Sequence, residues 1–330
     1  MNSDSFLEFE KMIYTEKNMF SKLDIDDSDF IINHLVIYPS LRPLELDKIV
    51  HLSKMYCDDL CFRQKLLKKA SKSCYIMVYR LFMDDIYTFN EVFHYLECEN
   101  SIIFGCYFMN EFNDFSNYIS SKTIPDDFDM DLLDRENDLK TIIQYGFMPS
   151  TIEFCLKYDD FFSFKDIVLD FSDLKSRELR WSLFEWSHIP TSLDALSFAG
   201  FFGSTRIFKY LLMNGFPINE IIMENIVCSG NFDLFHCCYD SMSDLSRLLI
   251  NAVEFFQVPL LQFLLEYGAD INYNSDDQGS PLHVASKKGF LTITQFLVDS
   301  GANLEIRKGS RVFCKNYGLQ FIMLAGMDIS

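Results

Sequence analysis

The feature that most constrains the fold of this chain is a short segment that returns with a fixed period in its C-terminal third. The segment Tyr267-Gly268-Ala269-Asp270-Ile271-Asn272 recurs as Ser300-Gly301-Ala302-Asn303-Leu304-Glu305, and the two glycines lie 33 residues apart. A third copy surrounds Gly215. Periods of roughly 20 to 50 residues are typical of stacked repeats, in which each unit buries its apolar face against its neighbours. The sequence therefore predicts an array of repeats.

An apolar stripe precedes each copy, with the spacing of one helix face. The glycine after each stripe suits a helix end in the left-handed backbone region, which glycine adopts without a clash at Cβ. Each copy is therefore predicted to follow a short helix. The stripes consist of Ile207, Tyr210, Leu211 and Leu212, of Leu260, Phe263, Leu264 and Leu265, and of Ile293, Phe296, Leu297 and Val298.

The first half of a unit is clearest between Gly279 and Gly289. Ser280 is placed to cap a helix, and Pro281 suits the first helical turn because its missing N–H has no partner there. Ala285 is small at a point where two helices must approach closely, and Gly289 ends the helix. A complete unit is thus predicted to read turn, helix, turn, helix.

This unit resembles an ankyrin repeat, whose T-P-L-H-x-A signature appears here as Ser280-Pro281-Leu282-His283-Val284-Ala285. The full motif covers about 120 residues, from Leu193 to Lys308. The resemblance implies an all-α fold, an ankyrin-repeat α-solenoid of helix-turn-helix units. It also implies that His283 bonds the Ser280 hydroxyl and a backbone carbonyl, a structural role that we favour over catalysis because a lone histidine lacks partners.

Other units are placed by the residue that occupies the mid-repeat glycine position. A degenerate unit is expected at 152–168 and another at 102–119. In chain order the position is held by Asp159, Gly203, Gly230, Phe256 and Gly289.

A narrower similarity covers most of the chain. Residues 181–187, 196–204 and 208–215 are similar to a large family of divergent ankyrin proteins expanded in parasitic protists such as trichomonads. Members of that family carry a divergent helical region ahead of the clear repeats. The resemblance implies an ankyrin-type fold and no known chemistry.

The rest of the chain is expected to be organised around the array. Residues 1–100 show helical spacing without the repeat period and are predicted to form a helical cap over the N-terminal face of the solenoid. Residues 101–190 are interpreted as degenerate ankyrin-like repeats that include an acidic loop at 124–138, and residues 191–310 as ankyrin repeats. Residues 311–330 are interpreted as an atypical C-terminal cap or a truncated repeat.

Charge and hydropathy exclude several classes of function. The 29 Lys and Arg against 48 Asp and Glu leave a net charge of −19, which argues against binding nucleic acid or anionic lipid. Membrane insertion is not expected, because no apolar run reaches the roughly 20 residues of a membrane span. The acidic start is unlike a secretory signal. With ten dispersed cysteines, we predict a cytoplasmic or otherwise intracellular protein with reduced thiols.

A calcium loop is suggested by the spacing of Asp127, Asp129 and Asp131. Leu132 and Asp138 stand where such a loop needs glycine and glutamate. A solvated acidic loop is therefore the favoured interpretation.

A zinc site is suggested by Cys57 and Cys61, which would share one helix face, with His51 upstream. The second ligand pair that zinc usually needs is absent from the sequence. Glycine-rich phosphate loops and nucleophile elbows are absent as well. We therefore predict no metal, no cofactor and no enzyme activity.

Partner binding is expected on the concave side of the array, which in ankyrin proteins is formed by hairpin tips and first-helix faces. The two residues before each mid-repeat glycine usually face that groove. Phenylalanines exposed there would anchor an apolar or aromatic peptide, and the alternative is that they belong to the core. With two hairpin residues added, the candidate residues are Phe201, Phe202, Ser229, Glu254, Phe255, Asp276, Asp277, Lys287 and Lys288.

The sequence thus predicts a non-enzymatic, monomeric scaffold that binds another protein, whose identity the sequence does not give. The alternative is an adaptor that recruits the bound partner to an enzyme, such as a ubiquitin ligase, through residues 1–100. A catalytic role ranks third, because no set of polar residues marks an active site.

Overall fold

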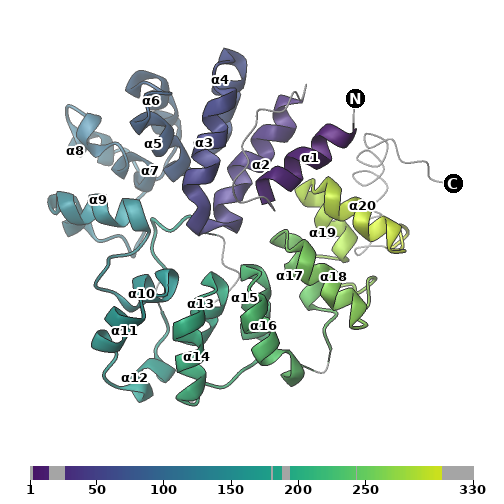
Figure 1. Ribbon diagram of the computed structural model, residues 1–330. Coiled ribbons are helices and arrows are strands. Elements are labelled where there is room, and N and C mark those ends of the chain that lie inside the picture. Colours follow the sequence, from purple (N-terminus) through teal and green to yellow (C-terminus); the bar gives the residue numbers. More distant parts are fainter. Residues whose placement is uncertain (1–2, 15–26, 180, 188–193, 243, 307–330) are drawn as a thin grey trace. The chain divides into compact units, whose positions relative to one another are not determined.

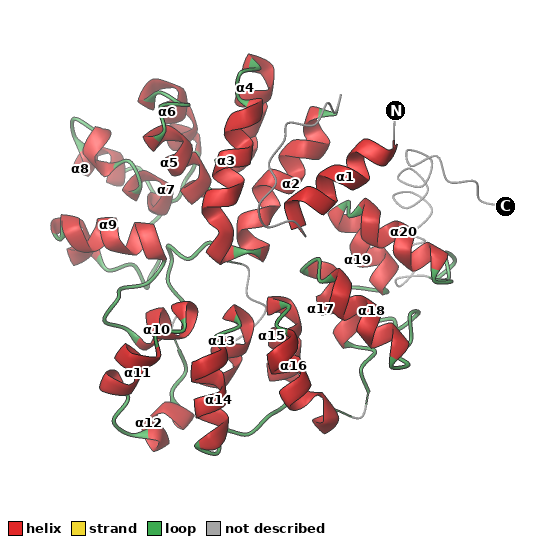
Figure 2. Ribbon diagram, viewed as in Figure 1, coloured by secondary structure: helices red, strands yellow, loops and turns green. Residues whose placement is uncertain are grey.

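The computed structural model describes residues 3–14, 27–179, 181–187, 194–242 and 244–306 (Figure 1). Over these residues the chain consists of short helices, 3-10 turns and connecting loops, without a strand (Figure 2). The all-α prediction is therefore confirmed for the part of the chain that the structure describes. Residues 311–330, interpreted from the sequence as a cap or a truncated repeat, lie outside it.

The chain forms two compact units. Unit 1 comprises residues 1–19, 155–179 and 191–330, and unit 2 comprises residues 20–154 and 180–190. Helix α10 (Ile152–Tyr158) spans the point where the chain passes from unit 2 into unit 1. Both units thus combine segments that are far apart in sequence, unlike the consecutive divisions expected from the sequence.

Unit 1 contains a run of helix pairs between residues 195 and 299. The first helices stack in chain order, α13 on α15, α15 on α17 and α17 on α19 (Figure 1). Stripe residues such as Ile207, Leu264 and Leu297 are fully buried, which confirms the predicted repeat array. The pairs are α13 (Ala195–Phe202) with α14 (Thr205–Met213), α15 (Glu220–Ser229) with α16 (Phe232–Cys238), α17 (Leu248–Glu254) with α18 (Val258–Glu266), and α19 (Pro281–Lys288) with α20 (Leu291–Asp299).

The turn inside each pair reverses the chain through one residue with a left-handed backbone. Gly230 and Gly289 have φ of 72° and 78°, and Phe256 adopts the same region with φ of 54°. This conformation costs a residue other than glycine about 1–2 kcal/mol. The cost is offset because the Phe256 ring is buried against Tyr14 and Phe290, at centroid distances of 4.0 and 4.9 Å. The turn position assigned to Phe256 from the sequence is confirmed.

The degenerate unit expected at 152–168 makes the same turn. Asp159 lies between α10 and α11 (Phe161–Ile167) with φ of 53°. Its carboxylate accepts hydrogen bonds from the backbone N–H groups of Arg206 and Ile207, at 3.2 and 3.0 Å. These donors belong to the first turn of α14, which has no carbonyl of its own to offer them. Asp159 therefore ties this unit to the next one. Helix α12 (Phe171–Ser176) follows in the same unit.

A matched pair of glycine substitutions is expected to separate backbone strain from lack of space. Gly230→Ala should lower the free energy of unfolding by about 2–3 kcal/mol: roughly 1 for the left-handed backbone and the rest for a displaced side chain. An added Cβ would overlap the amide of Gln257, which donates to Cys228 O at 2.7 Å. Gly268→Ala, with φ of 89° and nothing within 4 Å, should cost only about 1 kcal/mol. Urea unfolding checks the difference, and equal losses would contradict the role of Gln257.

Helix α1 (Ser3–Tyr14) belongs to unit 1, where it packs against α20. The fully buried Glu10 carboxylate accepts hydrogen bonds from the backbone N–H groups of Leu291 and Thr292, at 2.8 and 2.7 Å. A carboxylate in this position caps the N-terminus of a helix and complements its dipole. Helix α1 thus covers the last described repeat, whereas the cap that the rest of residues 1–100 is expected to form over the N-terminal face of the array stays a prediction.

Unit 2 is also built from short helices. Asp85 joins α5 to α6 with φ of 59°, the same left-handed turn that Asp159 makes. Residues 1–100 show no 33-residue period, and at this turn an aspartate stands where glycine marks the turn in the clear repeats. The helices are α2 (Ser28–Leu41), α3 (Leu46–Tyr56), α4 (Leu60–Ala70), α5 (Tyr75–Met83), α6 (Phe89–Cys98), α7 (Ile102–Cys106), α8 (Phe115–Ile119) and α9 (Glu136–Tyr145).

The acidic stretch 124–138 is a loop only in its first part. Met130–Asp134 forms a 3-10 turn, and α9 begins at Glu136. Arg135 lies between these elements and pairs with Asp129 at 2.5 Å and with Asp138 at 3.2 Å. The expected acidic loop is therefore corrected to a loop followed by helical turns that an arginine helps to neutralise.

Candidate functional site

The phenylalanines predicted to line a binding groove are buried. Phe201, Phe202 and Phe255 expose 4%, 8% and 1% of their surface. The rings of Phe201, in α13, and Phe255, just after α17, meet edge to face with centroids 5.7 Å apart, and both helices pack against α15. The expected aromatic groove is therefore wrong. These rings form core between repeats and are not available to a partner.

The polar residues of the predicted groove have separate roles. Ser229 bonds within its own helix end. Glu254 and Lys288 form an ion pair of 3.1 Å between neighbouring repeats, and Gln278 donates to the same carboxylate at 3.3 Å. The structure thus brings Glu254 and Lys288 together. The exposed members of the set are Asp276, Asp277 and Lys287.

The repeat signature forms a capped helix start at α19. The Ser280 hydroxyl accepts the backbone N–H of His283 at 3.4 Å, and His283 Nδ1 accepts the Ser280 N–H at 3.2 Å. The hydroxyl and Nδ1 lie 2.7 Å apart. The expected pairing of His283 with Ser280 is present, and the buried ring stabilises this turn.

The cysteines considered for zinc lie on different elements. Cys57 is buried in the turn after α3, whereas Cys61 is exposed in the first turn of α4, so the expectation of one shared helix face is wrong. Burial raises the pKa of the Cys57 thiol to about 12. Among the residues that the structure describes, no group of three or more His, Cys, Asp or Glu side chains is placed to hold a metal ion.

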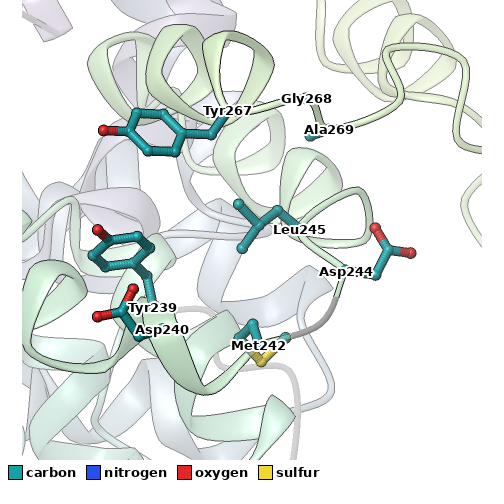
Figure 3. Close-up of a pocket in the computed structure, with 8 residues that line it drawn as sticks. All are labelled: Tyr239, Asp240, Met242, Asp244, Leu245, Tyr267, Gly268 and Ala269. Carbon is teal, nitrogen blue, oxygen red and sulfur yellow. The ribbon is translucent and has the colours of Figure 1, made fainter.

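A surface pocket of about 340 Å³ lies where two successive repeats pass into their connecting loops (Figure 3). One side follows the end of α16, through the 3-10 turn Tyr239–Ser241 and the loop toward α17. The other side is the end of α18, where Tyr267 is the C-cap residue. The lining residues are Tyr239, Asp240, Met242, Asp244, Leu245, Tyr267, Gly268 and Ala269.

Two tyrosine rings are among the side chains that line the pocket. The centroids of Tyr239 and Tyr267 lie 6.2 Å apart with their planes at 82°. Tyr267 is 59% exposed and stacks on Phe263 at 4.1 Å. Phe263 in turn contacts the fully buried Phe235 at 5.5 Å. The exposed ring is therefore supported by the packed helices beneath it and does not depend on a loop for its position.

The pocket is negatively charged. Asp240 and Asp244 both line it (Figure 3). The charge of Asp240 raises the pKa of Tyr239, which keeps this phenol neutral. A hydrogen bond of 2.8 Å from the backbone N–H of Ser246 lowers the pKa of Asp244, which is therefore ionised at neutral pH. Helices α16 and α18 end at the pocket, and helix C-termini carry partial negative charge.

A second cavity of about 180 Å³ shares Met242 and Asp244 with the first. Its lining includes Arg247, whose Nε lies 2.6 Å from a Glu224 carboxylate oxygen and whose Nη1 lies 3.8 Å from Glu220. Burial raises the pKa of Glu224, and the adjacent guanidinium counteracts that rise. This surface therefore already holds one guanidinium among carboxylates.

The sequence carries a signal for this surface that is spread over many residues. Between Lys209 and Lys287 it contains ten Asp and Glu residues and a single basic residue, Arg247, a net charge of −9. The acids do not form a cluster like the one at 124–138, so the stretch does not stand out locally. Tyr239 and Tyr267, each just after the second helix of its repeat, complete the pattern.

Comparison with known proteins identifies repeats in part of this region. Residues 249–298 match the family model described as ankyrin repeats (many copies). The ankyrin repeat and KH domain-containing protein mask-1 of Caenorhabditis elegans is 27% identical over 129 residues, which is 37% of this chain and 5% of that protein. The crystal structure of the human ASB11 ankyrin repeat domain aligns at 16% identity with a TM-score of 0.38, covering 55% of this chain and 86% of that one.

Proposed function

We propose, from the ankyrin repeats that residues 249–298 carry, that unit 1 is a non-enzymatic module that binds another protein at the pocket between Tyr239 and Tyr267. Stacked repeats present extended surfaces suited to protein partners. The observation that carries the proposal is the partly exposed pair of tyrosines over a cavity, on helices that are packed underneath. Tyrosine is enriched in interface cores because it offers a large contact area at a low entropic cost.

The proposal is tested by cross-linking followed by affinity measurement. A photo-reactive phenylalanine analogue at position 267 should capture a protein that the same analogue at position 213 does not, since Met213 is 85% exposed but lies outside the pocket. With that partner purified, Tyr267→Ala should weaken binding about tenfold or more. Met213→Ala is the matched control. Equal capture at both positions together with unchanged affinity would rule out the pocket as the contact.

A second contact is proposed along the connecting hairpins and first helices. The polar residues that the sequence predicts on the concave side are candidates for it, without the three buried phenylalanines. The side chains of Glu254 and Lys288 are each at most about a quarter exposed. A partner would therefore contact the more exposed candidates before this ion pair. These candidates are Ser229, Glu254, Asp276, Asp277, Lys287 and Lys288.

An adaptor role is the alternative, in which residues 1–100 recruit an enzyme such as a ubiquitin ligase while unit 1 holds the partner. The observation in its favour is that residues 20–100 and the repeats belong to different compact units. An adaptor should keep its enzyme in the Tyr267→Ala variant while losing the other partner. Loss of both together would exclude two separate surfaces.

The other predictions concern membrane insertion, the oligomeric state, the cellular location and the narrower family similarity. Among the described helices, none is long and apolar enough to cross a membrane. A monomeric state and an intracellular location stay predictions, as does the similarity to divergent ankyrin proteins of parasitic protists. Sedimentation of the purified chain at several concentrations tests the first of these.

A further inference from the structure

We infer that the pocket between Tyr239 and Tyr267 receives an arginine side chain from a basic segment of the partner. The inference rests on the proposed function, because it names the chemistry of the group that the pocket accepts. It specifies the charge, the shape and the residue type of the side chain that the pocket accepts.

The pocket favours a cation for three reasons that add together. Its lining includes two acidic residues, Asp240 next to the Tyr239 ring and Asp244, whose carboxylate points away from the rings and accepts the Ser246 N–H (Figure 3). It lies at the C-terminal ends of α16 and α18, whose dipoles place partial negative charge there. The uncovered outer face of a tyrosine attracts a cation through the ring quadrupole; the other faces of Tyr267 and Tyr239 stack on Phe263 and Phe235. A neutral group would gain nothing from these negative charges, and an acidic group would be repelled by them.

The geometry favours arginine over lysine. A planar guanidinium stacks on one tyrosine ring while its edge donates hydrogen bonds to a carboxylate, which a compact ammonium cannot do together. The two rings meet edge to face, at 82°, and each has one face stacked on a phenylalanine, Tyr267 on Phe263 and Tyr239 on Phe235. A flat group would therefore stack on the outer face that remains uncovered. The pocket is also large enough for the stem as well as the head of the side chain, at about 340 Å³.

The adjoining cavity already holds an arginine side chain next to a carboxylate of the same chain. There the chain's own Arg247 lies 2.6 Å from Glu224, among acidic side chains that belong to the same surface. The surrounding stretch, residues 210–286, has a net charge of −9. Charge complementarity therefore selects a basic segment of a partner and not an isolated small cation.

The test follows the methyl group of Met242, which lines the pocket, by NMR of the full-length chain labelled at its methionine methyl groups. Met242→Leu assigns the signal. The probes are blocked peptides of sequence Gly-Ser-Xaa-Gly-Ser, with arginine, lysine or the neutral isostere citrulline at Xaa. We expect the arginine peptide to shift the Met242 signal saturably, the lysine peptide to bind at least about threefold more weakly, and the citrulline peptide to have little effect.

Two charge variants sharpen the test. Asp240→Asn should weaken binding of the arginine peptide about threefold to tenfold, and Asp299→Asn, the same change at an exposed acid outside the pocket, should leave that binding unchanged. Binding should also weaken as the salt concentration rises from ~50 to ~300 mM. Circular dichroism verifies that both variants are folded.

Each outcome decides the inference separately from the proposed function. Equal binding of arginine and lysine peptides would overturn the choice of arginine, and equal binding of citrulline would overturn the requirement for a cation. A partner that cross-links at position 267 through a segment without arginine would refute the inference and leave the proposed function standing. Failure of cross-linking at that position would remove both.

Discussion

Replacing Phe255 with glutamate is expected to unfold unit 1. Phe255 is 1% exposed and its ring meets that of Phe201 between stacked repeats. Loss of a buried aromatic side chain costs about 3–5 kcal/mol, and burying a carboxylate without a partner adds at least ~2 kcal/mol. The sum approaches the whole stability of a typical domain, about 5–15 kcal/mol. Circular dichroism and thermal unfolding should show a loss of helix content and of the transition that unit 1 contributes.

The control is the same substitution at an exposed phenylalanine. Phe162, in α11 of the same unit, is 74% exposed, so Phe162→Glu should change the free energy of unfolding by no more than about 0.5 kcal/mol. If Phe255→Glu unfolded at the wild-type temperature, the Phe255 ring would have to be reachable from solvent. Phe201, Phe202 and Phe255 would then again be candidates for an aromatic binding groove.

Removing the carboxylate of Glu10 is expected to destabilise the last described repeat. Glu10→Ala leaves the N–H groups of Leu291 and Thr292 without the two bonds that now cap α20, at a cost of about 2–4 kcal/mol. The exchange protection of these two amides should fall by about 30-fold or more, as measured by hydrogen exchange. Tyr14→Ala should have a loss of similar size, about 3 kcal/mol, because its ring stacks on Phe256 at 4.0 Å.

Glu8→Ala is the matched control, since Glu8 lies in the same helix and is exposed. It should leave the exchange of α20 unchanged. If Glu10→Ala and Glu8→Ala gave the same protection at Leu291, then α1 would not hold the array in solution. The packing of α1 on the last described repeat would then be wrong for the protein in solution.

The local features of the repeats could be predicted from the sequence because they depend on neighbouring residues. The apolar spacing sets the buried face of each helix, and a left-handed turn follows where glycine permits it. Even Phe256 and Asp159 were assigned to that turn from their spacing alone, and both have positive φ. Asp85 shows the limit of this reasoning, because without a period to align it an aspartate gives no sign of the same turn.

What the sequence by itself determined is therefore the all-α array, the helix ends and the cap at Ser280, all of which arise from interactions within a few residues. The tertiary structure alone decided which side chains are covered. Phe201 and Phe255 are core because their rings meet where α13 and α17 both pack against α15, and Glu10 is a cap because α1 reaches a helix 281 residues away. The pocket likewise exists only where Tyr239 and Tyr267 meet. Contacts between distant segments leave no periodic trace in a chain, so burial and binding surfaces follow from packing and not from pattern.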